Sequence, residues 1–200
     1  MKNNKNNKKF EAILFLLGML GIFTGNAFAQ APANDNFAGA EQLTGMRASV
    51  TRSNAEATKE TGEPNHAGNP GGKSVWFRWT APMSRVMRFT TNRSEGNIDT
   101  LLQVYRGSDL TALSIEGFSN DIHNVNKRSF TRVRVLAGET YYIAVDGYKF
   151  QDQPAVEGTF VLDIHPSFQF QGADYDSDGV YCYAVATSLN GEVFLEHEGE

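Results

Sequence analysis

The sequence DYDSDG at residues 174–179 is the sharpest candidate for chemistry in this chain. Asp174, Asp176 and Asp178 alternate along a tight loop, and Gly179 permits the sharp turn that such a loop needs. Carboxylate oxygens that converge on one point suit Ca²⁺, which prefers hard oxygen ligands. The sequence therefore predicts a calcium site at Asp174, Asp176 and Asp178. The alternative is an acidic, solvated turn.

The residues after this loop depart from the usual calcium-loop patterns. An EF-hand needs a bidentate acid at its twelfth position, which here is Val185, so an EF-hand is excluded. Shorter calcium loops place an acid near the ninth position, which here is Cys182, and a thiol is a poor calcium ligand. Cys182 is the only cysteine, so the chain forms no internal disulfide, and a small buried residue is its alternative role.

A second set of acidic and amide side chains is spread over the rest of the chain. Its members are Asn34, Asp35, Asn36, Asp99, Asn120, Asp121 and Asp146. Each of them alone is typical of an ordinary turn. Several could nevertheless meet at one end of a β-sandwich and hold a structural cation there.

Signals for catalysis are weak. The four histidines, His66, His123, His165 and His197, are scattered, and neither an HExxH pair nor a G-x-S-x-G elbow is present. Glu60 and Glu63 flank a Thr-Gly dipeptide, but two carboxylates in a loop are commonplace. We expect no catalytic residue, and we expect His66 to order the surrounding glycine-rich loop or to face solvent.

Two tryptophans offer a possible sugar-stacking platform. Trp76 and Trp79 are three residues apart, which places them on opposite faces of a strand. At least one of them is then expected to lie in the core.

Most of the chain has the period-two alternation of half-buried β-strands. The expected strands are residues 74–80, 85–91, 100–105, 129–136, 139–146 and 158–164. Gly, Asn and Asp separate them, and no long segment has helical periodicity, although residues 37–43 could form a short helical turn capped by Asn36. The pattern predicts an all-β fold, an antiparallel jelly-roll-like sandwich, with a short β-hairpin appendage at the C-terminal end.

The first residues are typical of an export signal. Four lysines precede the apolar run at residues 12–23, and Ala27-Phe28-Ala29 suits signal peptidase, so we expect a signal peptide at residues 1–29. The apolar run is shorter than the roughly 20 residues of a membrane span. Losing the leader, with its four lysines and one glutamate, would change the formal net charge from −5 to −8, which disfavours nucleic acid and anionic lipid as partners.

Several separate blocks resemble one family when they are taken in order. They are PANDNF (32–37), ATKETGEP (57–64), HAG (66–68), GGKSVWFRWTAP (71–82), DTLLQVY (99–105) and YYIAVDG (141–147). This order resembles the bacterial pre-peptidase C-terminal (PPC) domain family over about residues 31–164. The resemblance implies a jelly-roll-like sandwich that is not itself catalytic and accompanies secreted proteases and other exported proteins. Some members of the family bind calcium, and some related modules bind collagen or other polymers.

The C-terminal residues resemble the start of an FG-GAP/VCBS-type repeat, in which the loop acids bind calcium. The resemblance divides the chain into a PPC-like sandwich at 30–165, a linker at 166–173 and a partial repeat at 174–200. It departs from the repeat pattern at Cys182, where an acid is usual.

The leading functional hypothesis is a non-catalytic module, secreted or at the cell surface, that serves adhesion, targeting or stability and is stabilised by calcium. Its expected partners are an extracellular polymer, either collagen or a polysaccharide, or a cognate secreted protein. We expect no nucleic acid and no stable membrane insertion after signal cleavage. The alternative is a domain associated with a secreted peptidase whose catalytic part lies outside this chain.

Overall fold

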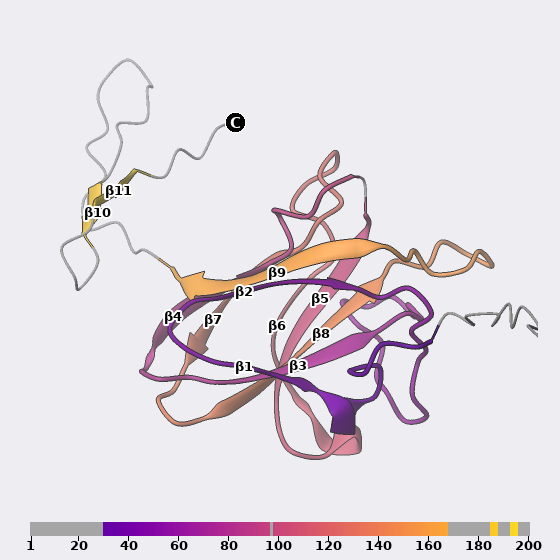
Figure 1. Cartoon of the computed structure of the whole chain (residues 1–200), viewed down its shortest axis with the longest axis horizontal. Helices are drawn as coiled ribbons and strands as arrows, with labels where there is room; N and C mark the ends of the chain where they lie inside the picture. Colours follow the sequence, from indigo (N-terminus) through magenta and orange to yellow (C-terminus); the bar gives the residue numbers. More distant parts are fainter. Residues whose placement is uncertain (1–29, 97, 168–184, 188–192, 196–200) are drawn as a thin grey trace, which may run out of the picture. The chain divides into compact units, whose positions relative to one another are not determined.

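The computed structural model describes residues 30–96, 98–167, 185–187 and 193–195, and residues 31–167 hold two β-sheets packed together (Figure 1). The first sheet runs in the order β1 (Glu41–Leu43), β3 (Val75–Thr80), β8 (Thr140–Gly147), β5 (Thr100–Arg106) and β6 (Ser114–Ser119). The second runs in the order β2 (Ala48–Ser53), β9 (Thr159–Pro166), β4 (Arg85–Thr90) and β7 (Phe130–Val135). The predicted all-β sandwich is confirmed.

Strand direction departs from the prediction at one place. The described strand pairs are antiparallel except β1 and β3, which pair in parallel, with Leu43 opposite Trp79. The predicted C-terminal hairpin is present as β10 (Val185–Thr187) and β11 (Val193–Leu195), which pair antiparallel.

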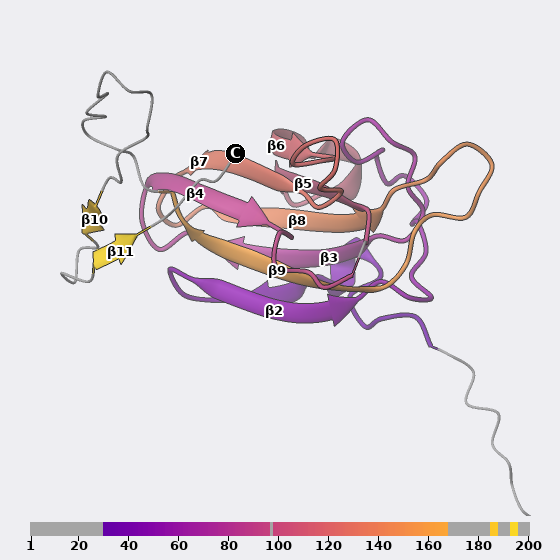
Figure 2. The ribbon, with the colours of Figure 1, turned by 90° about the horizontal axis from the view of Figure 1, so that it is seen from above.

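The core lies between the two sheets, which Figure 2 shows from above. Alternate residues of each strand point inward, so both sheets supply large apolar side chains to one cluster. Its largest fully buried members are Phe77, Trp79, Tyr141, Phe89, Phe160, Met87, Leu102, Ile143 and Leu162. Trp79 also donates its indole N–H to the carbonyl oxygen of Gly45 at 2.8 Å.

The six strands expected from alternation are all present, and each bound differs by at most two residues. Three further strands, β1, β2 and β6, were not predicted. In β2 and β6 most residues are exposed or half-buried, so their sequences lack the alternation that marks a strand with one buried face.

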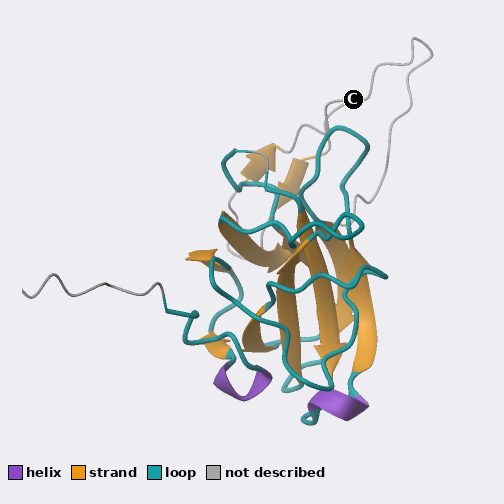
Figure 3. Cartoon of the chain, turned by 90° about the vertical axis from the view of Figure 1, so that its right-hand side faces the viewer, coloured by secondary structure: helices purple, strands orange, loops and turns teal. Residues whose placement is uncertain are grey.

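The helical turn expected at residues 37–43 is shorter than predicted. A 3₁₀ turn, η1 (Phe37–Gly39), is followed at once by β1, so residues 41–43 are strand and that part of the prediction is wrong. Asn36 precedes η1, but its side chain makes no capping hydrogen bond. With η2 (Leu110–Ala112), η1 completes the helical segments of the described chain (Figure 3).

The outer face of the five-stranded sheet is covered rather than open to water. Trp76 of β3 and Tyr105 of β5 lie on this face with their rings 5.8 Å apart, and both are fully buried. Phe37 from η1 packs edge-on against Trp76 at 5.2 Å. The η1 segment and the loop that leads into β3 therefore cover this face. No helix among the described residues is long and apolar enough to cross a bilayer.

Candidate functional site

A group of four buried polar side chains lies on the outer face of the five-stranded sheet, and we call Glu63, His66, Tyr105 and Asp146 the buried polar centre. His66 Nε2 lies 2.7 Å from Glu63 Oε1, and His66 Nδ1 lies 2.9 Å from the Tyr105 hydroxyl. The side chains of Glu63 and His66 are inaccessible to solvent. The hydrogen bonds between them tie the loop before β3 to strand β5.

Asp146 binds the end of the same loop that leads directly into β3. Its carboxylate accepts backbone N–H bonds from Gly72 and Lys73 at 3.1 Å and 2.7 Å, and from Gly147 at 2.7 Å. Nearby, Gln103 of β5 accepts a hydrogen bond from the backbone N–H of Ala67 at 2.5 Å. The expectation that His66 orders the glycine-rich loop is therefore confirmed, and the loop is attached to the sheet at several points.

Burial and hydrogen bonding oppose each other in this centre. Burial raises the pKa of Glu63, but hydrogen bonds led by the one from His66 outweigh it, so the pKa lies below its ordinary value. Burial raises the pKa of Asp146, and His66 together with the three backbone N–H groups offsets part of that rise. Burial, Glu63 and Asp146 raise the pKa of Tyr105, so the phenol stays protonated and can donate to His66.

The buried polar centre contains a possible metal-binding triad. Single ligand atoms of Glu63, His66 and Asp146 all lie within 4.8 Å of one another, and this mixed nitrogen and oxygen set would suit zinc better than calcium. However, Glu63 and His66 bind each other, and Asp146 already accepts three N–H bonds. The side-chain atoms that would bind an ion already make hydrogen bonds within the protein, so the centre fits a structural network better than an ion site.

The same geometry argues against catalysis in the buried polar centre. A carboxylate, an imidazole and a hydroxyl in sequence resemble the relay that activates a nucleophile. A reacting substrate must reach the hydroxyl, however, and Tyr105 is 1% exposed while His66 is 0% exposed. The relay is closed to substrate.

The predicted second acidic set is only partly brought together. Asp99 immediately precedes β5, and Asn120 and Asp121 follow β6, which pairs with β5; we call these three residues the acidic loop cluster. Each has a buried Oδ1 atom that accepts no hydrogen bond within the described part of the chain. Burial, and then the charge of Asp121, raise the pKa of Asp99 to about 6, although Lys127 acts in the opposite direction. Lys127 Nζ lies 2.7 Å from the other oxygen of Asp121.

The other members of that set do not join the cluster. Asn34 donates its side-chain amide to the carbonyl oxygen of Trp76 at 3.0 Å, and Asp35 accepts from the backbone and hydroxyl of Thr58. Asp146 belongs to the buried polar centre. Asn34, Asp35 and Asp146 therefore bind other parts of the chain, and the prediction that several members of the set hold a structural cation remains only for Asp99, Asn120 and Asp121.

The tryptophan platform is also wrong. Trp79 lies in the core between the sheets and Trp76 under η1 and the loop before β3, and both are 0% exposed. Neither ring can receive a sugar face.

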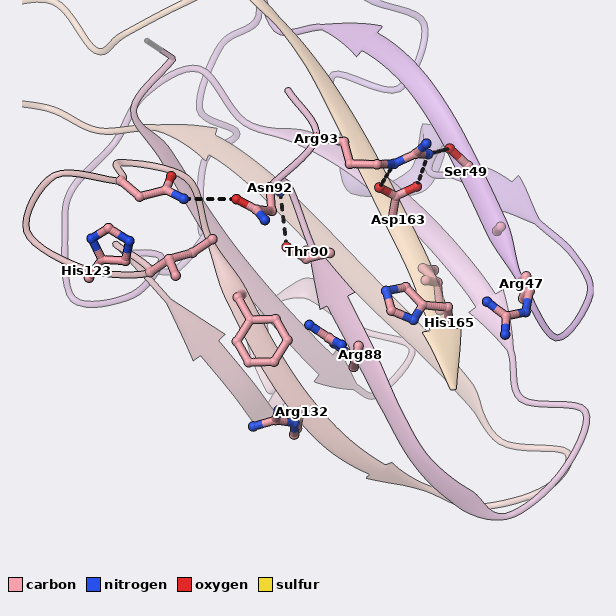
Figure 4. Close-up of a pocket in the computed structure, with 15 residues that line it drawn as sticks. Arg47, Ser49, Arg88, Thr90, Asn92, Arg93, His123, Arg132, Asp163 and His165 are labelled. Carbon is pink, nitrogen blue, oxygen red and sulfur yellow. Dashed lines mark hydrogen bonds and ion pairs between the residues drawn. The ribbon is translucent and has the colours of Figure 1, made fainter. Parts of the chain in front are cut away.

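The outer face of the four-stranded sheet carries a groove of about 910 Å³ (Figure 4). Its charged and titratable lining residues are mainly basic, and they define what we call the basic groove: Arg47, Arg88, Arg93, Arg132, His123 and His165, with Asp163 as the one acid among the lining residues that the structure describes. Arg93 holds that acid in an ion pair and also donates to Ser49 at 2.7 Å.

Positively charged side chains are concentrated in the basic groove, and they affect one another. Burial lowers the pKa of His165, and the nearby guanidinium groups of Arg88 and Arg47 lower it further. The guanidinium carbons of Arg88 and Arg132 each lie 4.8 Å from the centre of the Phe130 ring. The ring holds two cations against its faces by cation–π attraction.

The predicted calcium ligands Asp174, Asp176 and Asp178, and Cys182 beside them, lie outside the described residues, as does the expected signal peptide at residues 1–29. No protein-family model matches the chain, and no curated protein is significantly similar to it.

Proposed function

We propose that this chain is a non-catalytic, exported accessory module that binds an extracellular partner through the face of its four-stranded sheet. One contrast carries the proposal. The acid, imidazole and hydroxyl that are joined in a relay are sealed in the buried polar centre, whereas the basic groove is open and its charged lining residues are mainly arginines, which stay protonated and bind anions. The PPC-like resemblance and the export signal agree with such a role.

Turnover assays test the absence of catalysis. The full chain, incubated with casein, gelatin, collagen and a panel of polysaccharides, should release no new amino termini or reducing ends above a blank purified in parallel. Turnover that persists through purification would contradict the proposal, and its loss in Glu63→Gln would assign it to the relay of the buried polar centre, which that change alters.

Calcium stabilisation is the second element of the proposal. Three buried oxygens of the acidic loop cluster have no hydrogen-bond partner among the described residues, and carboxylate and amide oxygens are the ligands that calcium prefers. Millimolar calcium at pH 7 should raise the unfolding midpoint by about 5 °C, since an ion that binds only the folded state stabilises it. Differential scanning fluorimetry measures this shift.

Two sets of variants separate the candidate calcium sites. Asp99→Asn should abolish the shift if the acidic loop cluster binds the ion, whereas Asp174→Asn, Asp176→Asn and Asp178→Asn together should abolish it if the C-terminal loop does. Magnesium is the control, because its strict octahedral geometry fits such loops poorly. No shift in the unaltered chain at millimolar calcium would contradict this element.

The raised pKa of Asp99 gives a pH dependence with a definite sign. Between pH values near 4 and 6, folded Asp99 is protonated while the unfolded carboxyl, with an ordinary pKa of 3.8, is ionised. The folded state then binds more protons, so this residue favours folding at low pH and the contribution is lost as the pH rises through about 6. In chelator, the stability of the unaltered chain relative to Asp99→Asn should therefore be greater at pH 5 than at pH 7. Equal differences at the two pH values would contradict the assignment.

A further inference from the structure

We propose that the ligand of the basic groove is an acidic polysaccharide, lying across the four-stranded sheet with its anionic groups on a row of basic side chains. The inference rests on the proposed function, because it names the class of partner that the open face binds. The main observation behind the inference is the register of the strands, which places basic residues side by side.

The row crosses all four strands of the sheet. Arg88 of β4 is directly opposite Arg132 of β7 on one side and His165 of β9 on the other. Arg47 immediately precedes β2, whose first residue pairs with Ile164, and Figure 4 shows it next to His165. In the sheet order β2, β9, β4, β7, the row therefore reads Arg47, His165, Arg88 and Arg132.

The spacing of this row suits a sugar polymer. Neighbouring strands lie about 4.8 Å apart, so the four positions span about 14 Å. The distance from one strand to the next is comparable with the length of one sugar ring. A polymer with an acid on each ring could therefore present successive anions to successive strands. Guanidinium groups bind carboxylate and sulfate through paired N–H donors.

The members of the row act on one another, since Arg88 and Arg47 both disfavour the charged form of His165. The guanidinium carbons of Arg88 and Arg132 both lie over the Phe130 ring, and this contact keeps their guanidinium groups in place before a ligand binds.

Nucleic acid is the less favoured polyanion. The chain has a formal net charge of −5, so a duplex that extended beyond the groove would meet an acidic protein. Phe130 is engaged by two guanidinium groups and is not offered as a free face on which a base could stack. A flexible polysaccharide with one acidic group on each ring can stay within the groove.

Affinity electrophoresis of the full chain tests the inference. Polygalacturonate supplies carboxylates, dextran sulfate supplies sulfates, dextran is the neutral polymer and a DNA duplex is the competing polyanion. We expect retardation by at least one acidic polysaccharide, weakening as salt is raised, and none by dextran. The carboxylate and sulfate arms distinguish the two sources of negative charge.

Matched variants locate the binding surface. The pair Arg88→Gln and Arg132→Gln should weaken binding by about tenfold or more, because two charge-assisted contacts are lost. Arg78→Gln makes the same change at an exposed position on the other sheet and should leave the affinity within about twofold. If the double variant fails to fold, the exposed Arg132→Gln alone should still weaken binding measurably.

Three results would overturn the inference. Unchanged affinity in Arg132→Gln, tighter binding to DNA than to either acidic polysaccharide, or no retardation by either would do so. Binding to dextran instead would overturn the inference but leave the proposed accessory role intact, whereas shortening of any polymer during the assay would contradict that role itself.

Discussion

Replacing His66 by leucine should lower the free energy of unfolding by about 3–5 kcal/mol. The side chain of Glu63 is fully buried and its pKa is held below the ordinary value by hydrogen bonds, of which the one from His66 is the strongest. Leucine fills the space but leaves the carboxylate without this partner, and a buried unpaired charge is costly. Equilibrium unfolding in urea, followed by tryptophan fluorescence, measures the loss.

A double variant separates the pairing from the packing. In His66→Leu with Glu63→Gln, the buried charge is removed while an oxygen remains to accept the backbone N–H of Glu60, which lies 2.9 Å from Glu63. The double variant should recover about 1–3 kcal/mol of the loss. Equal destabilisation in the single and double variants would show that packing, not charge pairing, is what His66 provides.

Gly71→Ala should be about as damaging, with a loss of about 4 kcal/mol or more. A Cβ atom at Gly71 would overlap the carboxylate of Asp146. That carboxylate cannot move aside cheaply, because the backbone N–H groups of Gly72, Lys73 and Gly147 all donate to it in a buried site. The alanine variant must break these bonds or lift the loop from the sheet, and urea unfolding measures the cost.

Gly68→Ala is the matched control for this prediction. Gly68 has φ +77° and Gly71 has φ +55°, so both are left-handed positions, but a Cβ at Gly68 would meet no atom within 4 Å. Its substitution should cost only the backbone strain of about 1 kcal/mol. Similar losses in the two variants would mean that backbone conformation, and not the contact with Asp146, fixes Gly71.

The sequence was sufficient for the strands that bury one face. Alternation in residues such as Phe77 and Trp79, or Tyr141 and Ile143, marks strands whose inner faces meet in the core. It failed for β1, a three-residue parallel pairing, and for β6, where an exposed Ile115 and Phe118 obscure the pattern. Short edge strands carry too little burial to leave a signature.

The sites depended on long-range register, which local patterns do not encode. Glu63 and His66 are close in sequence, but Tyr105 and Asp146 reach them only because β5 and β8 pair with Leu101 opposite Asp146. The row of the basic groove likewise requires β4 to lie between β7 and β9. Arg88 and Arg132 were visible as polar positions of two strands, and only the sheet order makes them neighbours.

A crystal structure of the full chain with a trimer of galacturonate tests the central claim most directly. The proposed function and ligand predict an intact trimer across the four-stranded sheet, with carboxylates on Arg88 and Arg132 and no change in the buried polar centre. A trimer bound elsewhere, or one cleaved with a fragment beside His66 and Tyr105, would contradict a non-catalytic module that binds acidic polysaccharide through its basic groove.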